Sequence, residues 1–204
     1  MDSNRLLMND QFMEELDNKS LFSKKQSIEE INQRYFTELG NYVYRCAIIQ
    51  LNGLNGTMEA SFVEDFLSTL KKYIDQKNGE NERPVMSRIG YHQILLLLES
   101  AQEKMSSVNT VLEHILGEAL RMGSKYSGLK VAFSVGKPVR LDTNVMGLEE
   151  TLDSARTALN KRFTDGYGRI LLAENNRAAE NSDIDADMLK NLGKAVRSTS
   201  ESEI

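Results

Sequence analysis

Residues Ser87–Ser100 read SRIGYHQILLLLES, and this stretch decides the fold. A short extended piece, Arg88-Ile89, is followed by a tight Gly90–Gln93 turn and by the apolar run Ile94–Leu98, which is the pattern of a β-hairpin. The leucine run fits a buried helix as well, but its length is that of a strand. Because a turn and Glu99-Ser100 bound the run, it is typical of a central strand that is buried on both faces.

Outward from the hairpin, the periodicity predicts further strands and three helices. The strands are Val43–Leu51, Leu129–Val135 and Arg169–Leu172, and the helices are Met58–Ile74, a long helix capped by Ser106 or Ser107 that runs to about Tyr126, and Asn144 to about Lys161. The order βαββαβ is that of the split βαβ pattern, an antiparallel-containing sheet with helices on one face. The sequence therefore predicts an α+β, ferredoxin-like fold.

Two helical patterns precede this sheet and a weaker one follows it. Asn4–Asp17 and Ser27–Leu39 each place apolar residues on one face. Ser27 with Glu30 forms a capping-box signature, and Gly40 is the predicted stop. The weaker helix covers residues 184–196. We therefore divide the chain into an N-terminal helical linker (1–40), a central α+β domain (41–175) and a C-terminal linker helix with a tail (176–204).

Composition excludes several classes of protein. The chain is 40% hydrophobic and 27% charged, as is ordinary for a globular protein. No apolar run reaches the roughly 18 residues of a membrane span, and the start of the chain lacks signal-peptide character, so we expect a cytoplasmic protein with no membrane partner. A net charge of −5 argues against direct nucleic-acid binding. The single cysteine, Cys46, is expected to be a small buried hydrophobe.

Several local strings resemble the GGDEF domain family, the diguanylate cyclases. Arg88–Ile94, RIGYHQI, resembles the family's R-L-G-G-D-E-F hairpin and keeps the arginine, the apolar residue and the first glycine. Ala47–Asn52 stands where the family has an apolar strand that ends in D-x-D, and Val131–Gly136 resembles its V-T-V-S-I-G strand. The resemblance covers roughly residues 42–173, and it implies a nucleotide-cyclase-like, degenerate GGDEF domain over residues 41–175.

A closer resemblance is to the degenerate GGDEF-like domains of bacterial transcription regulators, both the YesN-type response regulators and the PucR/CdaR type. Ser154–Leu159, Arg162-Phe163 and Gly166–Ile170 resemble their S-x-x-E-A-x-x-A-L…R-F…G-x-G-x-I stretch. This implies a role in two-component signal transduction. The implied partners are a receiver domain and an AraC-type helix-turn-helix domain of the same polypeptide, with the DNA-binding part outside this chain.

Catalysis in that family requires carboxylates that hold Mg²⁺ against a triphosphate. The resemblance aligns these positions with Gln50 and Asn52 on the first strand and with His92 and Gln93 on the hairpin. Neutral amides do not supply the anionic ligands that Mg²⁺ prefers, and Tyr91 stands where the second glycine would let the backbone approach the nucleotide. We therefore expect no enzymatic activity, no catalytic residue, no metal ion and no cofactor.

Two alternative sites remain open from the sequence. The first is a ligand site in the vestigial cleft, where uncharged hydrogen-bonding side chains beside an aromatic ring would suit a neutral ligand; a solvated turn is the simpler interpretation. Its residues are Gln50, Asn52, Asn55, Gly90, Tyr91, His92 and Gln93. The second is a Cys46–His92 dyad, against which a buried thiol and a turn histidine are the commoner arrangement.

The function that the residues and the resemblance favour is a non-catalytic signal relay in a transcription regulator. A small-molecule or nucleotide sensor is the alternative, and an active diguanylate cyclase is the third hypothesis. The apolar face of the first helix, Leu6–Leu16, must be covered either by a second copy or a neighbouring domain, or by the chain's own sheet. Cover by a second copy predicts a homodimer through the N-terminal helices, and the sequence leaves these cases open.

Overall fold

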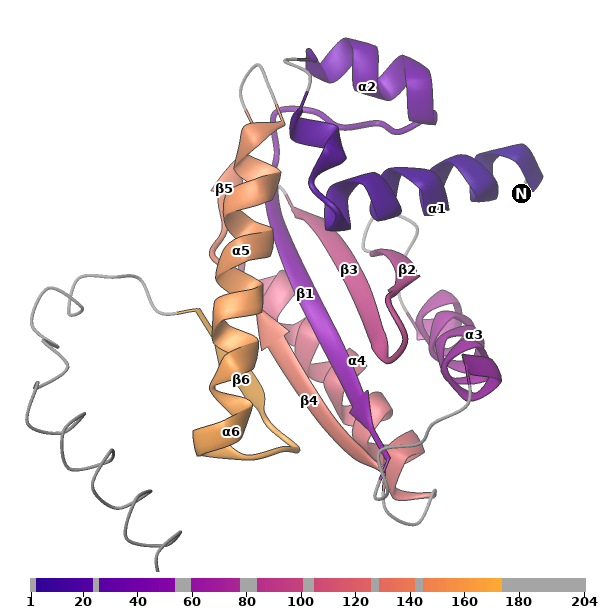
Figure 1. The fold of residues 1–204 in the computed structure, drawn as a ribbon, viewed down its shortest axis with the longest axis vertical. Coiled ribbons are helices and arrows are strands. Elements are labelled where there is room, and N and C mark those ends of the chain that lie inside the picture. The colour runs from indigo at the N-terminus through magenta and orange to yellow at the C-terminus, as the bar shows by residue number, and fades with distance from the viewer. Residues whose placement is uncertain are drawn as a thin grey trace, which may run out of the picture. The chain divides into compact units, whose positions relative to one another are not determined.

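The computed structural model describes residues 3–23, 26–53, 60–77, 84–100, 105–125, 129–141 and 145–173. Residues 1–173 form one compact unit. Its elements, in chain order, are α1 (Ser3–Asp17), η1 (Ser20–Phe22), α2 (Ile28–Tyr35), β1 (Val43–Asn52), α3 (Ala60–Lys77), β2 (Val85–Ile89), β3 (Gln93–Ser100), α4 (Met105–Ser124), β4 (Lys130–Val135), β5 (Val139–Arg140), α5 (Met146–Asn160), α6 (Arg162–Asp165) and β6 (Ile170–Leu172) (Figure 1).

The described strands form one mixed sheet in the order β2-β3-β1-β4-β6, and the short β5 pairs with the start of β1. β1 runs antiparallel to β3 and β4, β3 runs antiparallel to β2, and β6 is parallel to β4. β3 therefore lies between β1 and β2, as the split βαβ pattern requires. The α+β, ferredoxin-like fold predicted from the sequence is confirmed.

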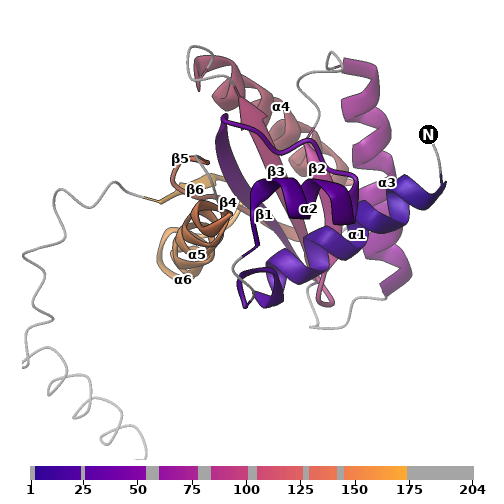
Figure 2. The same cartoon turned by 90° about the horizontal axis from the view of Figure 1, so that it is seen from above.

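Helices cover both faces of this sheet, which corrects the prediction that they lie on one face (Figure 2). On β1, Cys46 and Ile48 pack in the core that α1, α2 and α5 share, whereas Ala47, Ile49 and Leu51 pack in the core with α3 and α4. Residues 94–98 of β3 are likewise buried on both sides. Two strands that are apolar on both faces need a helical layer on each side.

The apolar residues in the second half of α1 are buried within the chain itself, whereas Leu7, nearer its start, is 63% exposed. Phe12, Met13 and Leu16 belong to the same core as β1 and β3, and the Phe12 ring lies 5.6 Å from that of Tyr35 on α2. Of the covers left open by the sequence, the chain's own sheet is therefore the one that Phe12, Met13 and Leu16 have. The homodimer stays a prediction.

Several predicted helix ends are corrected. The Ser27–Glu30 capping box is confirmed, but α2 ends at Tyr35, because Phe36 adopts a left-handed C-cap conformation with φ 54°. Gly40 is therefore not the stop. The Asn32 side chain holds the loop beyond the helix, since it both accepts from and donates to the backbone of Leu39. The helix α4 begins at Met105, so the two serines that follow lie inside its first turn and are not its N-cap.

The strands are longer than predicted around the hairpin, and three short elements were missed. The register pairs Ile89 with Gln93, which leaves Gly90, Tyr91 and His92 as the loop. The sequence did not predict η1, β5 or α6, each of which is very short. The weak helix predicted at residues 184–196 lies outside the described residues, and the three-part domain division stays a prediction. Among the described helices, none has the length and apolar character to cross a membrane.

Candidate functional site

The end of β1 and the hairpin loop between β2 and β3 place the predicted site residues side by side. Gln50 lies opposite Gln93 in the β1–β3 register, and Asn52 lies opposite Lys130 in the β1–β4 register. The backbone N–H of Leu51 donates to the carbonyl of His92 at 2.9 Å, which fixes the loop against the strand. The sheet therefore brings Gln50, Asn52, His92 and Gln93 to one end, as predicted.

The amide of Gln50 is the centre of this site and is nearly buried, with 8% of the residue exposed. Its Oε1 accepts from Gln93 Nε2 at 2.7 Å. Its Nε2 donates to Asn52 Oδ1 at 3.0 Å, to the Leu51 carbonyl at 3.1 Å and, at 3.4 Å, to the His92 carbonyl. Both ends of the amide are thus hydrogen-bonded within the protein.

Tyr167 completes the network, and the sequence analysis did not identify it. Asn52 Nδ2 lies 2.6 Å from the Tyr167 hydroxyl, and Lys130 Nζ lies 5.6 Å from the centre of the ring. The loop that carries the tyrosine is fixed because the Gly168 N–H donates to the Val131 carbonyl at 2.8 Å. The G-Y-G string at residues 166–168 was the available signal, but a turn between two glycines does not reveal which side chain it directs at β1.

The loop residues contribute less to the site than predicted. Gly90 has the left-handed φ of 56° that favours glycine, and the space around it is open. Tyr91 is 80% exposed, so it is not packed into the space where the resemblance placed it. His92 is half-buried, and its Nδ1 is enclosed without a hydrogen bond to the described residues. Asn55 lies outside the described residues.

The chemistry of this end of the sheet is that of neutral amides. Gln50, Asn52 and Gln93 bind one another and a phenol, and no carboxylate takes part in the hydrogen bonds among them. Among the described residues, no group of three or more His, Cys, Asp or Glu could hold a metal ion. The arrangement is suited to holding the loop on β1, and it supplies no anionic ligand.

The Cys46–His92 dyad is not formed. Cys46 is paired with Leu97 in the middle of the sheet and is fully buried, and burial raises the pKa of its thiol to about 12. His92 lies beside Leu51 at the C-terminal end of β1. Along β1, Cys46 and Leu51 are five residues apart, which is roughly 17 Å at the rise of a β-strand.

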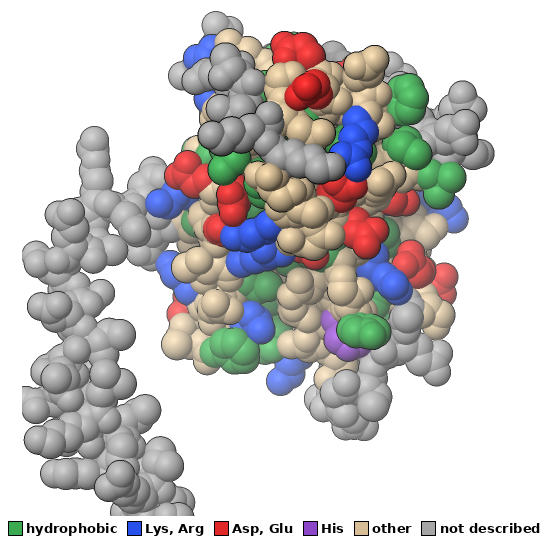
Figure 3. Space-filling model, turned by 45° about the horizontal axis from the view of Figure 1, so that its top comes forward, with side chains coloured by type: hydrophobic (Ala, Val, Ile, Leu, Met, Phe, Trp, Pro, Cys, Tyr) green, Lys and Arg blue, Asp and Glu red, His purple; other side chains and the backbone are tan. Residues whose placement is uncertain are grey.

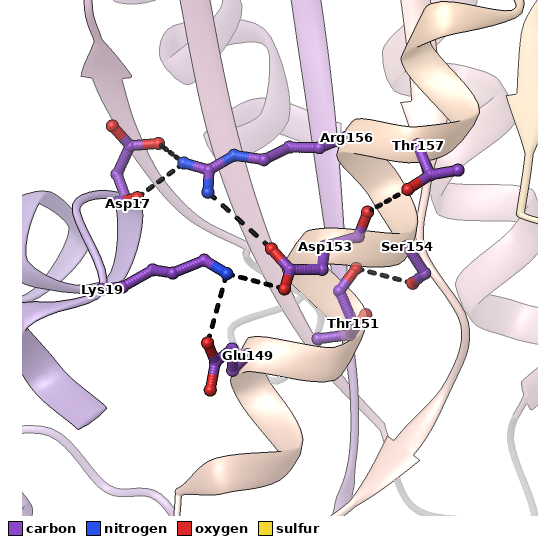
Figure 4. Close-up of polar contacts among 8 residues, drawn as sticks. All are labelled: Asp17, Lys19, Glu149, Thr151, Asp153, Ser154, Arg156 and Thr157. Carbon is purple, nitrogen blue, oxygen red and sulfur yellow. Dashed lines mark hydrogen bonds and ion pairs between the residues drawn. The ribbon is translucent and has the colours of Figure 1, made fainter. Parts of the chain in front are cut away.

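A second polar cluster joins the end of α1 to α5, and the sequence did not predict it (Figure 4). We call it the α1–α5 clasp, and it consists of Asp17, Lys19, Glu149, Asp153 and Arg156. Lys19 Nζ lies 2.7 Å from Asp153 Oδ2 and 3.2 Å from Glu149 Oε1, and these contacts, that with Asp153 first, raise the pKa of Lys19. Acidic and basic side chains are interspersed on the face that carries α1 and α5 (Figure 3).

No protein-family model and no curated protein sequence matches the chain. Solved structures do resemble it. An EAL/GGDEF domain protein from M. capsulatus is 16% identical, over 66% of this chain and 86% of that one, with a TM-score of 0.43. The active GGEEF domain of a diguanylate cyclase from Vibrio cholerae is 14% identical, over 65% of this chain and 83% of that one, with a TM-score of 0.43.

A third structure is that of the diguanylate cyclase SiaD from Pseudomonas aeruginosa with its activator SiaC. It is 16% identical, over 80% of this chain and 58% of that one, with a TM-score of 0.46. Because all three TM-scores lie below 0.5, the function proposed below rests on the residues of this chain and not on the likeness.

Proposed function

We propose that this chain is a degenerate GGDEF-like domain without catalytic activity that relays a signal within a bacterial transcription regulator. The observation that supports the proposal is the closed amide network of Gln50, Asn52 and Gln93. These residues occupy the positions at which the resemblance calls for metal-binding carboxylates. An amide that already binds its neighbours and carries no charge offers Mg²⁺ little.

The first test is turnover. The chain is incubated with GTP and Mg²⁺, and cyclic di-GMP is measured by mass spectrometry beside an active cyclase as the positive control. We expect no product above that of a heat-denatured sample. Appreciable product that is lost in Gln50→Ala would contradict the proposal and favour the cyclase hypothesis.

A sensor that uses the same end of the sheet is the second candidate. The enclosed Nδ1 of His92 and the uncharged groups around Gln50 favour it, because a small ligand with both donors and acceptors would find partners there. Against it, each polar end of the Gln50 side chain already has a partner. A ligand would therefore have to replace hydrogen bonds that the protein makes internally.

Thermal unfolding separates the relay from the sensor. A ligand that binds only the folded state, present at about 100 times its Kd, adds about 2.7 kcal/mol, which for a chain of this size raises Tm by roughly 5–10 °C. The probes are GTP with Mg²⁺, cyclic dinucleotides and a metabolite panel. A shift that Gln93→Leu abolishes would favour the sensor, whereas unchanged melting with every probe supports the relay.

The regulator context rests on the resemblance around residues 154–170. In such a protein a receiver and an AraC-type helix-turn-helix domain are the partners, and the whole acts in the cytoplasm. DNA binding then belongs to the full-length gene product. In mobility-shift assays at one fixed salt concentration, the full-length product should retard promoter DNA and this chain alone should not. Retardation by this chain alone would contradict the assignment.

A further inference from the structure

We propose that the α1–α5 clasp couples the position of the N-terminal helix to the central strand β1, so that a displacement of α1 is passed into the sheet. The inference rests on the proposed relay function and names the route by which the relay works. It starts from the end of α1, continues through α5 and ends at the backbone of Cys46.

The first link is between Arg156 and the last residue of α1. Arg156 Nη2 donates to the backbone carbonyl of Asp17 at 2.5 Å and to its Oδ1 at 2.6 Å (Figure 4). The carboxyl end of a helix has unpaired carbonyls and carries a partial negative charge, so a guanidinium there binds the helix end as well as a side chain. A movement of this end of α1 therefore changes the Arg156 contact directly.

The second link holds the corner after α1. Lys19 has a left-handed backbone, φ 64° and ψ 7°, which is unfavourable for a residue with a Cβ. Its ammonium binds both Asp153 and Glu149 on α5. The unfavourable corner and the ion pairs are thus parts of one arrangement, because relaxing the backbone of Lys19 would move its ammonium away from α5.

The third link runs from α5 to β1. Thr151 is fully buried, and its Oγ1 accepts from the backbone N–H of Cys46 at 2.9 Å. Ser154 Oγ accepts from the N–H of Lys137 at 2.8 Å and donates to the Thr151 carbonyl at 2.9 Å. A helix that supplies the hydrogen-bond partner of a central strand amide cannot shift without breaking that bond.

The α1–α5 clasp fixes the position of α1 on the sheet, but it contributes little to the free energy that holds α1 there. Phe12, Met13 and Leu16 are buried against the sheet and supply the adhesion, whereas the ion pairs are partly exposed and individually weak. The breaking of the clasp should therefore leave the fold intact. It should loosen the coupling between α1 and α5, and that difference makes the proposal testable.

The experiment is hydrogen–deuterium exchange of the whole chain, in a double-mutant cycle. The variants are Asp17→Lys, Arg156→Glu and the double swap, and the exchange of peptides from residues 8–17, 43–52 and 146–160 is followed. We expect each single variant to speed exchange at least fivefold in all three segments. The swap restores the side-chain ion pair but not the hydrogen bond to the Asp17 carbonyl, so it should recover only part of this increase in rate. Effects confined to the mutated element, or a swap that restores nothing, would overturn the proposal.

Two further variants keep the result interpretable. Thr151→Val cuts the link between α5 and β1, so in this background Asp17→Lys should no longer affect residues 43–52. Glu64→Gln removes a comparable surface ion pair, that of Glu64 with Arg88, and should leave the three segments unchanged. If Arg156→Glu fails to fold, Arg156→Gln replaces it. Because no GTP is used, failure of this cycle leaves the test of catalytic inactivity separate.

Discussion

Gly136, the residue that follows β4, approaches Thr151 on α5 so closely that a Cβ on the glycine would lie 2.0 Å from the threonine carbonyl oxygen. The close approach lets the N–H of Gly136 donate to the Cys46 carbonyl at 2.8 Å, while Thr151 Oγ1 accepts a hydrogen bond from the Cys46 N–H. Helix α5 thus contacts the backbone of the sheet directly. Four features lead to predictions: this contact, the left-handed backbone of Lys19, the buried Tyr35 hydroxyl and Cys46 thiol, and the amide network of Gln50.

Substitution of Gly136 by alanine should destabilise the protein. The backbone carbonyl cannot move aside cheaply, so overpacking should cost about 1–3 kcal/mol and lower Tm by roughly 2–12 °C. The matched control is Gly117→Ala in the interior of α4, where a Cβ meets nothing within 4 Å. That change should be neutral or stabilise by up to about 1 kcal/mol. Equal melting of the two variants would contradict the close contact.

The ammonium group and the left-handed backbone of Lys19 affect the stability separately, and two substitutions distinguish the two effects. Lys19→Gly and Lys19→Ala both remove the ammonium, but only alanine keeps the Cβ that disfavours the left-handed conformation. We expect the alanine variant to be less stable than the glycine variant by about 1 kcal/mol, as measured by urea unfolding with equal m-values. Two variants of the same stability would show that the corner is not strained.

Stability should fall in alkaline solution. Burial and then the hydrogen bond to Glu15 raise the pKa of Tyr35 to about 12, and burial raises the pKa of Cys46 to about 12, from ordinary values of 10.0 and 9.0. As pH rises above 9, the unfolded chain loses these protons first, so the stability is complete below pH 9 and is lost progressively up to pH 12. Urea midpoints at pH 8, 10 and 11 measure this decline.

The matched variant for the pH series is Tyr35→Phe with Cys46→Ala. It lacks both titrating groups, so its urea midpoint should depend less steeply on pH between 9 and 12. A slope that equals that of the wild type would assign the decline to other groups.

Replacement of the two β1 amides by carboxylates should create a response to Mg²⁺. In Gln50→Glu with Asn52→Asp, two like charges lie where the Gln50 and Asn52 side chains now meet at 3.0 Å. Repulsion should raise the pKa of one carboxyl and lower Tm, and millimolar Mg²⁺ should restore part of the loss. Wild type and Asn52→Asp alone serve as controls. An equal Mg²⁺ effect on all three proteins would contradict the prediction.

The sheet was predictable because its signal is local. The leucine run of β3 and the turn at Gly90 lie within one short stretch of sequence, and they identify the hairpin without tertiary information. The two-sided cover was missed although it follows from the same residues. A strand whose five consecutive apolar residues are all buried needs helices on both sides, which the βαββαβ order alone does not supply.

The candidate site was predictable only in part. Gln50, Asn52 and Gln93 were found through their positions in a resembling motif. Their side chains are hydrogen-bonded to one another, and ligand binding there stays a prediction. Tyr167 comes from a loop 115 residues beyond Asn52, and Arg156 lies 139 residues beyond Asp17. Contacts at such separations leave no periodicity in the sequence, so neither the phenol nor the clasp could be inferred from spacing.

The burial of α1 on the sheet has a consequence for shortened forms of this protein. A protein that begins at residue 41 would lack Phe12, Met13 and Leu16, and would leave uncovered the sheet face that Ile48, Leu95 and Leu97 help to form. An apolar surface of that kind promotes aggregation. The first helix thus acts as an intramolecular cover that keeps the sheet soluble, and the shortest well-behaved version of this protein should retain it.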